Sequence, residues 1–200
     1  MRLVDALDEV LGTRGRVRVL RALIAAPESL PASGREIARR TGLAHPQASS
    51  ILGSFVAQGL VTRHRGPRIH LYDLNRSHVL LPHLEALFEG EAAVRPALDA
   101  LLRERLSAGP ILKAAVFGSA VVDGMDVESD LDLAIVARPG SESEVAGLLD
   151  GMAEEVRARF GIRLSPLVSF GEKDAWPKRP PIWRRIEAEG LPLSLSREAG

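Results

Sequence analysis

The amino-acid sequence predicts a mixed α/β (α+β) protein built from two domains in succession. Residues 16–60 show helical spacing of apolar side chains and lead into two short, alternating runs of the strand type. Residues 111–170 instead alternate apolar runs of strand length with one amphipathic helix. The charge divides in the same way: residues 1–88 hold twelve Arg against seven acids (+5), and the remainder holds fourteen basic against nineteen acidic residues (−5). A chain of 200 residues is long enough to bury two small cores.

The composition excludes several classes of site. The chain has no cysteine, so it has neither a disulfide framework nor a thiolate metal site. Its first twelve residues are interrupted by acids and lack the apolar region of a signal peptide. No run approaches the ~20 apolar residues that cross a membrane. We therefore expect a cytoplasmic protein with no membrane partner.

Two helices are predicted early in the chain. Apolar spacing in RVRVLRALIAA, residues 16–26, is typical of an amphipathic helix. After the helix-breaking PESLPAS, Ser33 and Glu36 stand at the spacing of a capping box. In such a box the Ser33 hydroxyl accepts a hydrogen bond from a free amide, and the Glu36 side chain reaches back to the cap residue. The short helix that begins there is expected to end at Gly42.

A third helix is predicted over residues 43–60, where Pro46 suits the first turn because proline has no amide hydrogen to leave unpaired. Its apolar residues fall on one side, and small polar residues face away from them. Such residues permit close approach to DNA and can form hydrogen bonds to base edges or phosphates. We predict DNA contacts from His45, Gln47, Ser49 and Ser50.

A β-hairpin is predicted next, because LVTRHRGPRIHLYDL alternates as two strands around Gly66 and Pro67. Basic residues gather at its tip: Arg63, His64, Arg65 and Arg68. A basic hairpin of this kind can hold phosphates or enter the minor groove of DNA. We therefore predict DNA contacts from these four residues as well.

From Ser33 to Tyr72 the order of helix, helix and basic hairpin resembles the winged-helix domains of bacterial transcriptional regulators of the MarR and ArsR type. The resemblance covers about residues 10–75 and implies a winged helix-turn-helix domain, residues 1–76, that binds double-stranded DNA. Two alternatives are a winged helix that binds another protein and an arginine-rich hairpin that is only solvated. The basic tip and the polar helix face favour DNA.

Residues 77–108 are predicted to form a helical linker with interruptions at Pro82, Gly90 and Pro96. One apolar stripe runs along it: Leu80, Leu84, Leu87 and Phe88. This stripe can pack on a neighbouring domain, or it can pair two chains on a palindromic DNA site. We expect a homodimer.

The second domain, residues 109–200, is predicted to be a sheet covered by helices. Strands are predicted at residues 111–118, 130–137 and 161–170, and a helix at residues 141–160. Acids in the first turn of this helix and arginines in its last turn complement the helix dipole. Pro166 cannot donate a ladder hydrogen bond, so the third strand is expected to be an edge or bulged strand.

Asp130 and Asp132 lie at the beginning of the second predicted strand, and because side chains alternate along a strand they project from one face. Adjacent carboxylates repel each other, and Mg²⁺ is the simplest compensating cation. The turn at Gly118 and Ser119 lets backbone amides and a hydroxyl approach phosphate oxygens. These four residues predict a site for a metal-chelated triphosphate. The alternative is that Asp130 caps the strand and that Asp132 is hydrogen-bonded or solvated.

The sequence FGS, followed after ten residues by DLDL, resembles the signature of the DNA polymerase beta nucleotidyltransferase superfamily in its minimal branch. The resemblance covers about residues 95–190 and implies a nucleotidyltransferase fold with a small mixed sheet. It also implies that Gly118 and Ser119 bind the phosphates of an NTP. Asp130 and Asp132 would then be the catalytic residues that ligate Mg²⁺ during in-line transfer of a nucleotidyl group.

Two departures from the family pattern leave enzymatic activity undecided. Val122 stands where the family commonly has an Arg, and the third carboxylate that normally comes from the next strand is not found. The corresponding face of that strand carries Arg163, Ser165, Leu167 and Ser169. Glu172 and Asp174 lie just past the strand. General-base help is worth ~10²–10⁴-fold, so its loss leaves a slow enzyme or a nucleotide binder.

Together the two domains lead us to expect a DNA-binding transcriptional regulator whose nucleotidyltransferase-type domain binds Mg²⁺ and an NTP, with at most weak AMP transfer. The alternative is an active Mg²⁺-dependent nucleotidyltransferase that modifies a hydroxyl of a protein or small molecule, with the winged helix as an accessory. A third hypothesis, also implied by the resemblance, is an antitoxin-like module with a toxin as its protein partner.

Overall fold

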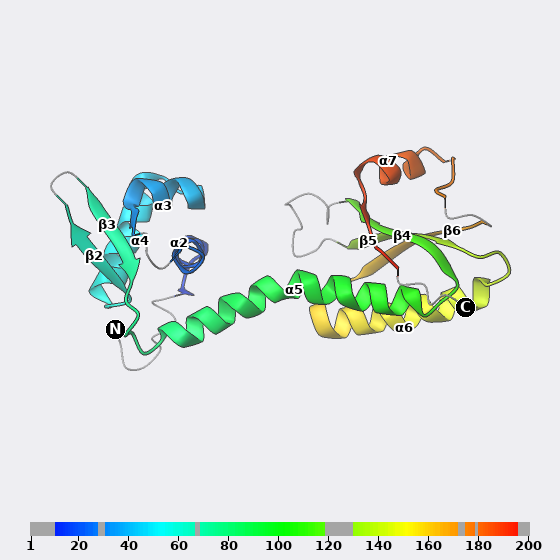
Figure 1. Ribbon diagram of the computed structural model, residues 1–200, viewed down its shortest axis with the longest axis horizontal. Coiled ribbons are helices and arrows are strands. Elements are labelled where there is room, and N and C mark those ends of the chain that lie inside the picture. Colours follow the sequence, from blue (N-terminus) through cyan, green and yellow to red (C-terminus); the bar gives the residue numbers. More distant parts are fainter. Residues whose placement is uncertain are drawn as a thin grey trace. The chain divides into compact units, whose positions relative to one another are not determined.

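The chain divides into two compact units, Met1–Ala92 and Ala93–Gly200 (Figure 1). The computed structural model describes residues 11–27, 31–66, 69–118, 130–171, 175–178 and 180–195. In the described part of the chain, no helix combines the length and the apolar character that spanning a membrane requires.

The N-terminal unit contains the three predicted helices, α2 (Arg14–Ile24), α3 (Gly34–Thr41) and α4 (His45–Ala57). Each begins and ends for a local reason. The Thr13 hydroxyl caps α2 by accepting a hydrogen bond from the amide of Arg16 (3.3 Å). Helix α3 ends at Gly42, whose φ of 67° is the left-handed conformation that glycine adopts most easily. Helix α4 begins with proline in its first turn.

A small antiparallel sheet completes this unit. Its strands are β1 (Ala32–Ser33), β2 (Val61–Arg65) and β3 (His70–Leu74), in the order β1-β3-β2. At the hairpin tip the amide of Gly66 donates to the carbonyl of Ile69 (3.0 Å). A Cβ at Gly66 would lie only 2.8 Å from that carbonyl oxygen, so the tight tip requires glycine. The predicted hairpin is therefore confirmed.

The core of the N-terminal unit gathers the inner faces of the helices and the sheet. Its largest fully buried side chains are Leu20, Ile37, Leu52, Phe55, Leu60 and Leu81. Burial of one such side chain stabilises a fold by about 1.5–3 kcal/mol, so these contacts fix how α2, α3 and α4 pack together.

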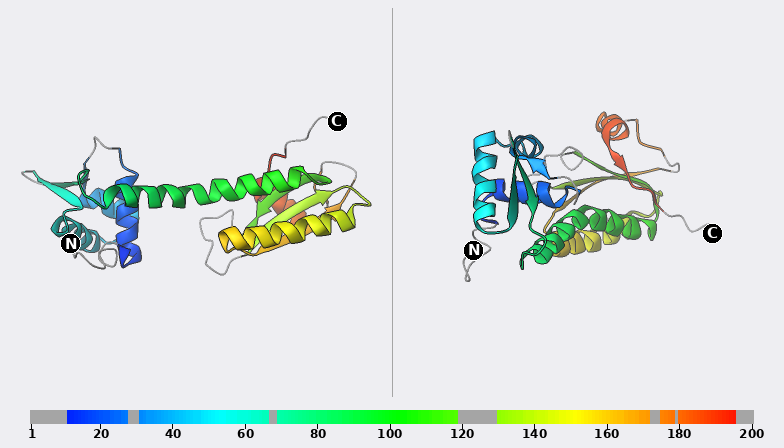
Figure 2. Two further views of the ribbon diagram at one scale, coloured as in Figure 1. Left: turned by 90° about the horizontal axis from the view of Figure 1, so that it is seen from below. Right: turned by 60° about the vertical axis from the view of Figure 1, so that its left-hand side comes forward.

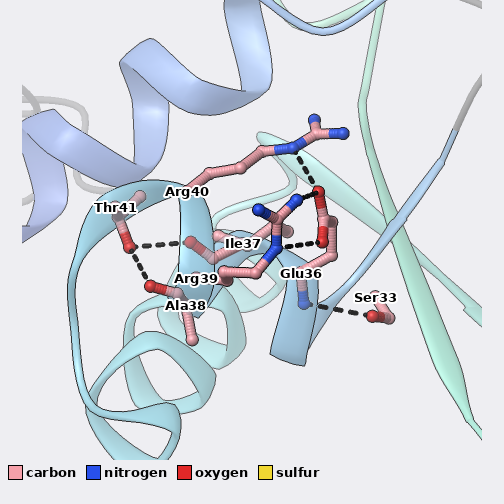
Figure 3. Close-up of polar contacts among 7 residues, drawn as sticks. All are labelled: Ser33, Glu36, Ile37, Ala38, Arg39, Arg40 and Thr41. Carbon is pink, nitrogen blue, oxygen red and sulfur yellow. Dashed lines mark hydrogen bonds and ion pairs between the residues drawn. The ribbon is translucent and has the colours of Figure 1, made fainter.

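One half of the predicted capping box is wrong. The Ser33 hydroxyl does accept a hydrogen bond from the Glu36 amide (3.2 Å), but the Glu36 carboxylate instead binds Arg39 (2.6 Å) and Arg40 (2.7 Å) (Figure 3). These two arginines donate three charge-assisted hydrogen bonds at helical spacing, which together are stronger than one bond to a neutral amide. The hydrogen bonds from Arg39 and then from Arg40 lower the pKa of Glu36 to about 2.

Helix α5 (Leu81–Ser107) is continuous, so the predicted interruptions at Pro82, Gly90 and Pro96 are wrong. Pro82 is the second residue of the helix, and an amide at this position has no acceptor within the helix. The missing amide hydrogen of proline therefore costs nothing there. Pro96 lies in the interior and removes one hydrogen bond, but packing continues on both sides of it. Before it, Leu84 and Phe88 lie in the core of the N-terminal unit. After it, buried leucines of α5 join the core of the C-terminal unit: Leu98, Leu101, Leu102 and Leu106.

The C-terminal unit is a mixed sheet with helices. Its elements after α5 are β4 (Ile111–Phe117), β5 (Leu131–Ala137), α6 (Glu142–Phe160), β6 (Leu164–Phe170), α7 (Ile182–Glu189) and β7 (Leu191–Pro192). The strand order is β6-β5-β4-β7, with β5 and β6 parallel and the other pairs antiparallel. The edge position of β6 confirms the expectation from Pro166. Strand β7 was not predicted, because two residues carry no periodicity.

The two faces of this sheet are covered unequally (Figure 2). Helices α5 and α6 cover one face, where Leu131, Leu133 and Ile135 of β5 are buried. The short helix α7 covers part of the other face through Trp183 and Ile186. The Trp176 ring stacks on Trp183 with centroids 5.6 Å apart, so both tryptophans contribute to the packing of α7 on the sheet.

We predict that Ser33→Ala lowers the free energy of unfolding by about 1 kcal/mol, because the first turn of α3 then loses its side-chain acceptor. Urea denaturation of the full chain measures this. Ser143→Ala is the matched control: Ser143 is exposed in the first turn of α6 and has no hydrogen bond within the described residues. Equal losses in both variants would show that the Ser33 cap is not stabilising.

We also predict that the Glu36 carboxyl titrates near pH 2 in the folded chain. Because its folded pKa lies below the ordinary value of 4.5, the ion pairs stabilise the fold above that value. This stabilisation is lost as the pH falls from about 4.5 towards 2. NMR of the side-chain carboxyl carbons measures the pKa. In the Arg39→Ala/Arg40→Ala variant the pKa should return towards its ordinary value, and an unchanged pKa would contradict the assigned cause.

Candidate functional site

Helix α4 presents one side to solvent along its whole length. Its inner side is buried through Ala48, Leu52 and Phe55. The outer side carries small exposed residues, namely Pro46, Ser50, Gly53 and Ala57. A Cβ at Gly53 would meet no atom within 4 Å, so nothing in the unit covers this surface. Side chains this small let the helix axis come close to a docking surface.

The four predicted contact residues of α4 lie around this outer side. His45, Gln47 and Ser50 are exposed and Ser49 is partly exposed. The Ser49 hydroxyl lies 3.5 Å from Nε2 of His45, one turn away on the helix. These side chains combine an amide, two hydroxyls and an imidazole, all of which can form hydrogen bonds to base edges or phosphates.

Helix α4 is held between α2 and α3 by two close approaches at glycine. A Cβ at Gly15 of α2 would lie 3.2 Å from Cδ1 of Ile51 and 3.5 Å from Nε2 of Gln47. A Cβ at Gly34 of α3 would lie 3.7 Å from both Nε2 of His45 and Oγ of Ser49. Residues two apart on a helix point in nearly opposite directions, so α2 and α3 contact opposite sides of α4. The exposed side lies between them.

Arg16 is a positioning residue that sequence analysis missed. Its Nη2 donates to the Ser54 hydroxyl at 2.8 Å, and its guanidinium lies 4.8 Å from the centroid of the Phe55 ring. Both partners belong to α4, so the contact fixes α4 against α2. The sequence offered no distinguishing signal, because Arg16 is one of three alternating arginines at the beginning of the first helix, and such residues are usually solvated.

The hairpin places a second set of predicted residues in solvent. Arg63, His64 and Arg65 of β2 are exposed, and each is paired in the ladder with a residue of β3. Side chains alternate along a strand, so Arg63 and Arg65 share one face of the hairpin and His64 lies on the other. Arg68 lies outside the described residues.

In the C-terminal unit, two parts of the predicted phosphate and metal site lie in direct contact. Gly118 follows β4, and Asp132 pairs with Phe117 in the antiparallel ladder. The φ of Gly118 is 73°, and a Cβ there would overlap Oδ2 of Asp132 and lie 3.1 Å from its Cγ. Only glycine leaves room for this carboxylate. Ser119 lies outside the described residues.

The carboxylates of β5 differ in exposure. Asp130 is exposed just before the strand, Asp132 is partly buried, and Leu131 between them points into the core. In the parallel ladder Asp132 lies beside Ser165 of β6, which offers a hydroxyl and no acid. No cluster of three or more metal-ligating residues occurs within the described residues, and Val122, Glu172 and Asp174 lie outside them.

An open depression of about 590 Å³ lies elsewhere in the N-terminal unit, between α2 and α3. Arg18, Arg21, Arg40 and Thr41 line it, together with small apolar residues near the end of α2. None of the predicted site residues lines this depression.

Comparison with known proteins bears on the N-terminal unit. Residues 13–68 match the sequence model of the MarR family. Among solved structures, the chain is similar to the MepR–DNA complex of S. aureus, with 20% identity, a TM-score of 0.36, and coverage of 48% of this chain and 79% of that one. It is also similar to the ferric uptake regulator (Fur) of Vibrio cholerae, with 14% identity, a TM-score of 0.29, and coverage of 80% and 88%. No curated protein matches.

The MarR match extends from the cap of α2 to the tip of the hairpin, and so covers α2, α3, α4 and β2. The predicted MarR resemblance is confirmed over this range. Residues 13–68 therefore form a MarR-family winged-helix domain, the DNA-binding domain of a MarR-type transcriptional regulator.

Proposed function

We propose that this regulator binds duplex DNA by inserting the outer side of α4 into the major groove and by laying the β2–β3 hairpin along the phosphates or into the minor groove. The observation that carries this proposal is the exposed polar surface of α4, which lies in the same unit as a hairpin with exposed arginines. An α-helix about 10–12 Å wide fits a major groove about 12 Å wide.

Base contacts are assigned to the residues near the beginning of α4. The Gln47 amide can bind adenine through two hydrogen bonds, and the hydroxyls of Ser49 and Ser50 can bind any base or a phosphate. His45 is the first residue of the helix and can contact a phosphate. The hairpin contributes charge rather than sequence readout, through Arg63, His64 and Arg65, with Arg68 assigned from sequence alone.

A homodimer is part of the same proposal, because dimers match palindromic DNA sites. Of the expected apolar stripe, Leu84 and Phe88 are buried within the N-terminal unit and are not available to a second chain. Leu87 remains 55% exposed, and Val79 nearby in sequence is 68% exposed. These two side chains support pairing of two copies through this part of the unit.

We further propose that the C-terminal unit binds Mg²⁺ and an NTP at Gly118, Asp130 and Asp132, with Ser119 assigned from sequence. The contact between Gly118 and the Asp132 carboxylate supports this proposal, because it brings a glycine turn next to a metal-type ligand. Mg²⁺ commonly takes one or two protein carboxylates and completes its shell with phosphate oxygens and water. Two carboxylates therefore fit this cation, which would neutralise the triphosphate when bound.

Nucleotidyl transfer in this unit is proposed to be weak at most. The position beside Asp132 in the parallel ladder carries Ser165, so an acid that could help to deprotonate an acceptor hydroxyl is missing there. Such help is worth ~10²–10⁴-fold. Rapid labelling of a protein or small-molecule hydroxyl would instead favour the active nucleotidyltransferase, or the antitoxin-like module when the labelled protein is a toxin.

We predict that DNA binding by the full chain weakens steeply with salt, and that Arg63→Ala/Arg65→Ala weakens binding to every duplex. The slope of log K against log salt is negative, and each lost phosphate contact reduces its magnitude by about 0.9. In the double variant the magnitude should therefore fall by about 2. Fluorescence anisotropy with random duplexes measures the slope. Arg103→Ala/Arg184→Ala removes the same charge from exposed positions of the C-terminal unit and is the control. Salt-independent binding, or equal loss in both variants, would refute the proposed role of the hairpin.

We predict that isothermal calorimetry detects Mg²⁺-dependent NTP binding that Asp132→Asn and Gly118→Ala each abolish. In Gly118→Ala the new methyl group collides with the Asp132 carboxylate, whereas Gly151→Ala adds a methyl group in open space on α6 and should bind normally. All four NTPs are tested. If both site variants bind NTP as the native chain does, the proposed site is refuted and Asp132 has only a structural role.

A further inference from the structure

Apart from Arg16, which binds Ser54 of α4, the described arginines of the N-terminal unit fall into two groups. The first group forms ion pairs: Arg21 pairs with Glu91, Arg39 and Arg40 share Glu36, and Arg76 pairs with Glu85. The second group is exposed and pairs with no acid in the described part of the chain; it comprises Arg14, Arg18, Arg35, Arg63 and Arg65. The unpaired charge on the hairpin belongs to the proposed DNA surface. The unpaired charge on the helices has no role in that proposal.

Two of these helical arginines lie beside the glycines that contact α4. Arg14 adjoins Gly15, which approaches Gln47 and Ile51. Arg35 adjoins Gly34, which approaches His45 and Ser49 on the opposite side of the helix. The backbone of each arginine therefore lies next to one side of the first half of α4, and its exposed guanidinium pairs with no acid in the described part of the chain.

The position of Arg14 is unfavourable in the absence of an anion. It is the first residue of α2, where the helix dipole is positive, and the first turn of α2 contains no acid to compensate. Arg18, which is also unpaired, lies four residues later on α2, and like charges at this spacing repel each other. A polyanion that lies against this surface offsets both effects, because each guanidinium then gains a phosphate partner.

We propose that Arg14 and Arg35 contact DNA phosphates on the two strands that border the major groove, one on each side of α4. This inference rests on the proposed insertion of α4. A helix about 10–12 Å wide fills a groove about 12 Å wide, so residues that flank the helix meet the two walls of the groove, which are phosphate backbones. The two arginines centre α4 in the groove and carry no sequence information themselves.

The test is a salt series of binding to random duplexes with the full-length variants Arg14→Ala, Arg35→Ala and Arg39→Ala. Each of the first two should reduce the magnitude of the negative slope of log K against log salt by about 0.9 for all duplexes. Arg14→Lys and Arg35→Lys retain the charge and should leave the slope unchanged. Arg39→Ala is the matched control: it removes the same charge from α3, but Arg39 already pairs with Glu36 and should leave the slope unchanged. Thermal unfolding checks that the folds remain intact.

Two results would overturn the inference. One is an unchanged slope in both Arg14→Ala and Arg35→Ala, and the other is a loss equal to that of Arg39→Ala, which would reveal only a general charge effect. Failure of the underlying proposal is distinguishable, because the native chain would then show no salt-dependent DNA binding and the hairpin variant would change nothing. Loss of slope in the hairpin variant alone would leave the DNA proposal standing and remove the flanking contacts.

Discussion

The close approach of α2 and α3 to opposite sides of α4 is the constraint on which the N-terminal unit depends. Glycine inside a helix costs about 0.5–1 kcal/mol relative to alanine, yet Gly15 occupies the first turn of α2, where a Cβ would lie 3.2 Å from Ile51. At Gly34, the first residue of α3, the approach is less tight, since a Cβ there would make ordinary contacts of 3.7 Å with His45 and Ser49. These approaches leave a single free side on α4, and the bond from Arg16 to Ser54 holds the helix in that orientation. The position of the exposed polar residues is thus a consequence of packing.

The charge pattern follows from the same arrangement. Glu36 lies on α3 at helical spacing from Arg39 and Arg40, and its one carboxylate pairs with both of these arginines near the end of that helix. Glu91 does the same for Arg21, whose guanidinium also lies 5.5 Å from the centroid of the Phe88 ring. Among the described residues, Glu36, Glu85 and Glu91 are thus engaged by arginines of the first group, whereas Arg14 and Arg35 on the helices and Arg63 and Arg65 on the hairpin have no acidic partner. The net charge of +5 over residues 1–88 does not say where on the surface the positive charge lies. The ion pairs decide which arginines remain available to bind an anion.

Local features were predictable from the sequence, and contacts between distant residues were not. Apolar spacing and capping residues predicted α2, α3 and α4, and Gly66 predicted the tip of the hairpin. Each of these elements depends on a few neighbouring residues. Glu36 was assigned the wrong partner, since the cap amide and two arginines compete for one carboxylate and only their geometry decides. The interruptions expected in α5 did not occur, because packing of its leucines on two cores outweighs one proline. Nothing in the sequence indicated that Arg16 would reach Ser54, 38 residues away.

The C-terminal unit shows how unequal covering of a sheet permits a partly buried carboxylate. Helices α5 and α6, of 27 and 19 residues, exclude water from one face, and the residues of β5 that point there are leucine and isoleucine. Helix α7, with eight residues, covers only part of the other face, where Asp132 and Ser165 lie side by side. A carboxylate that retains access to solvent keeps part of its hydration, which limits the cost of burying it. Any ligand of Asp132 therefore meets the sheet on the α7 side, next to Gly118, and leaves the leucine core on the opposite face undisturbed.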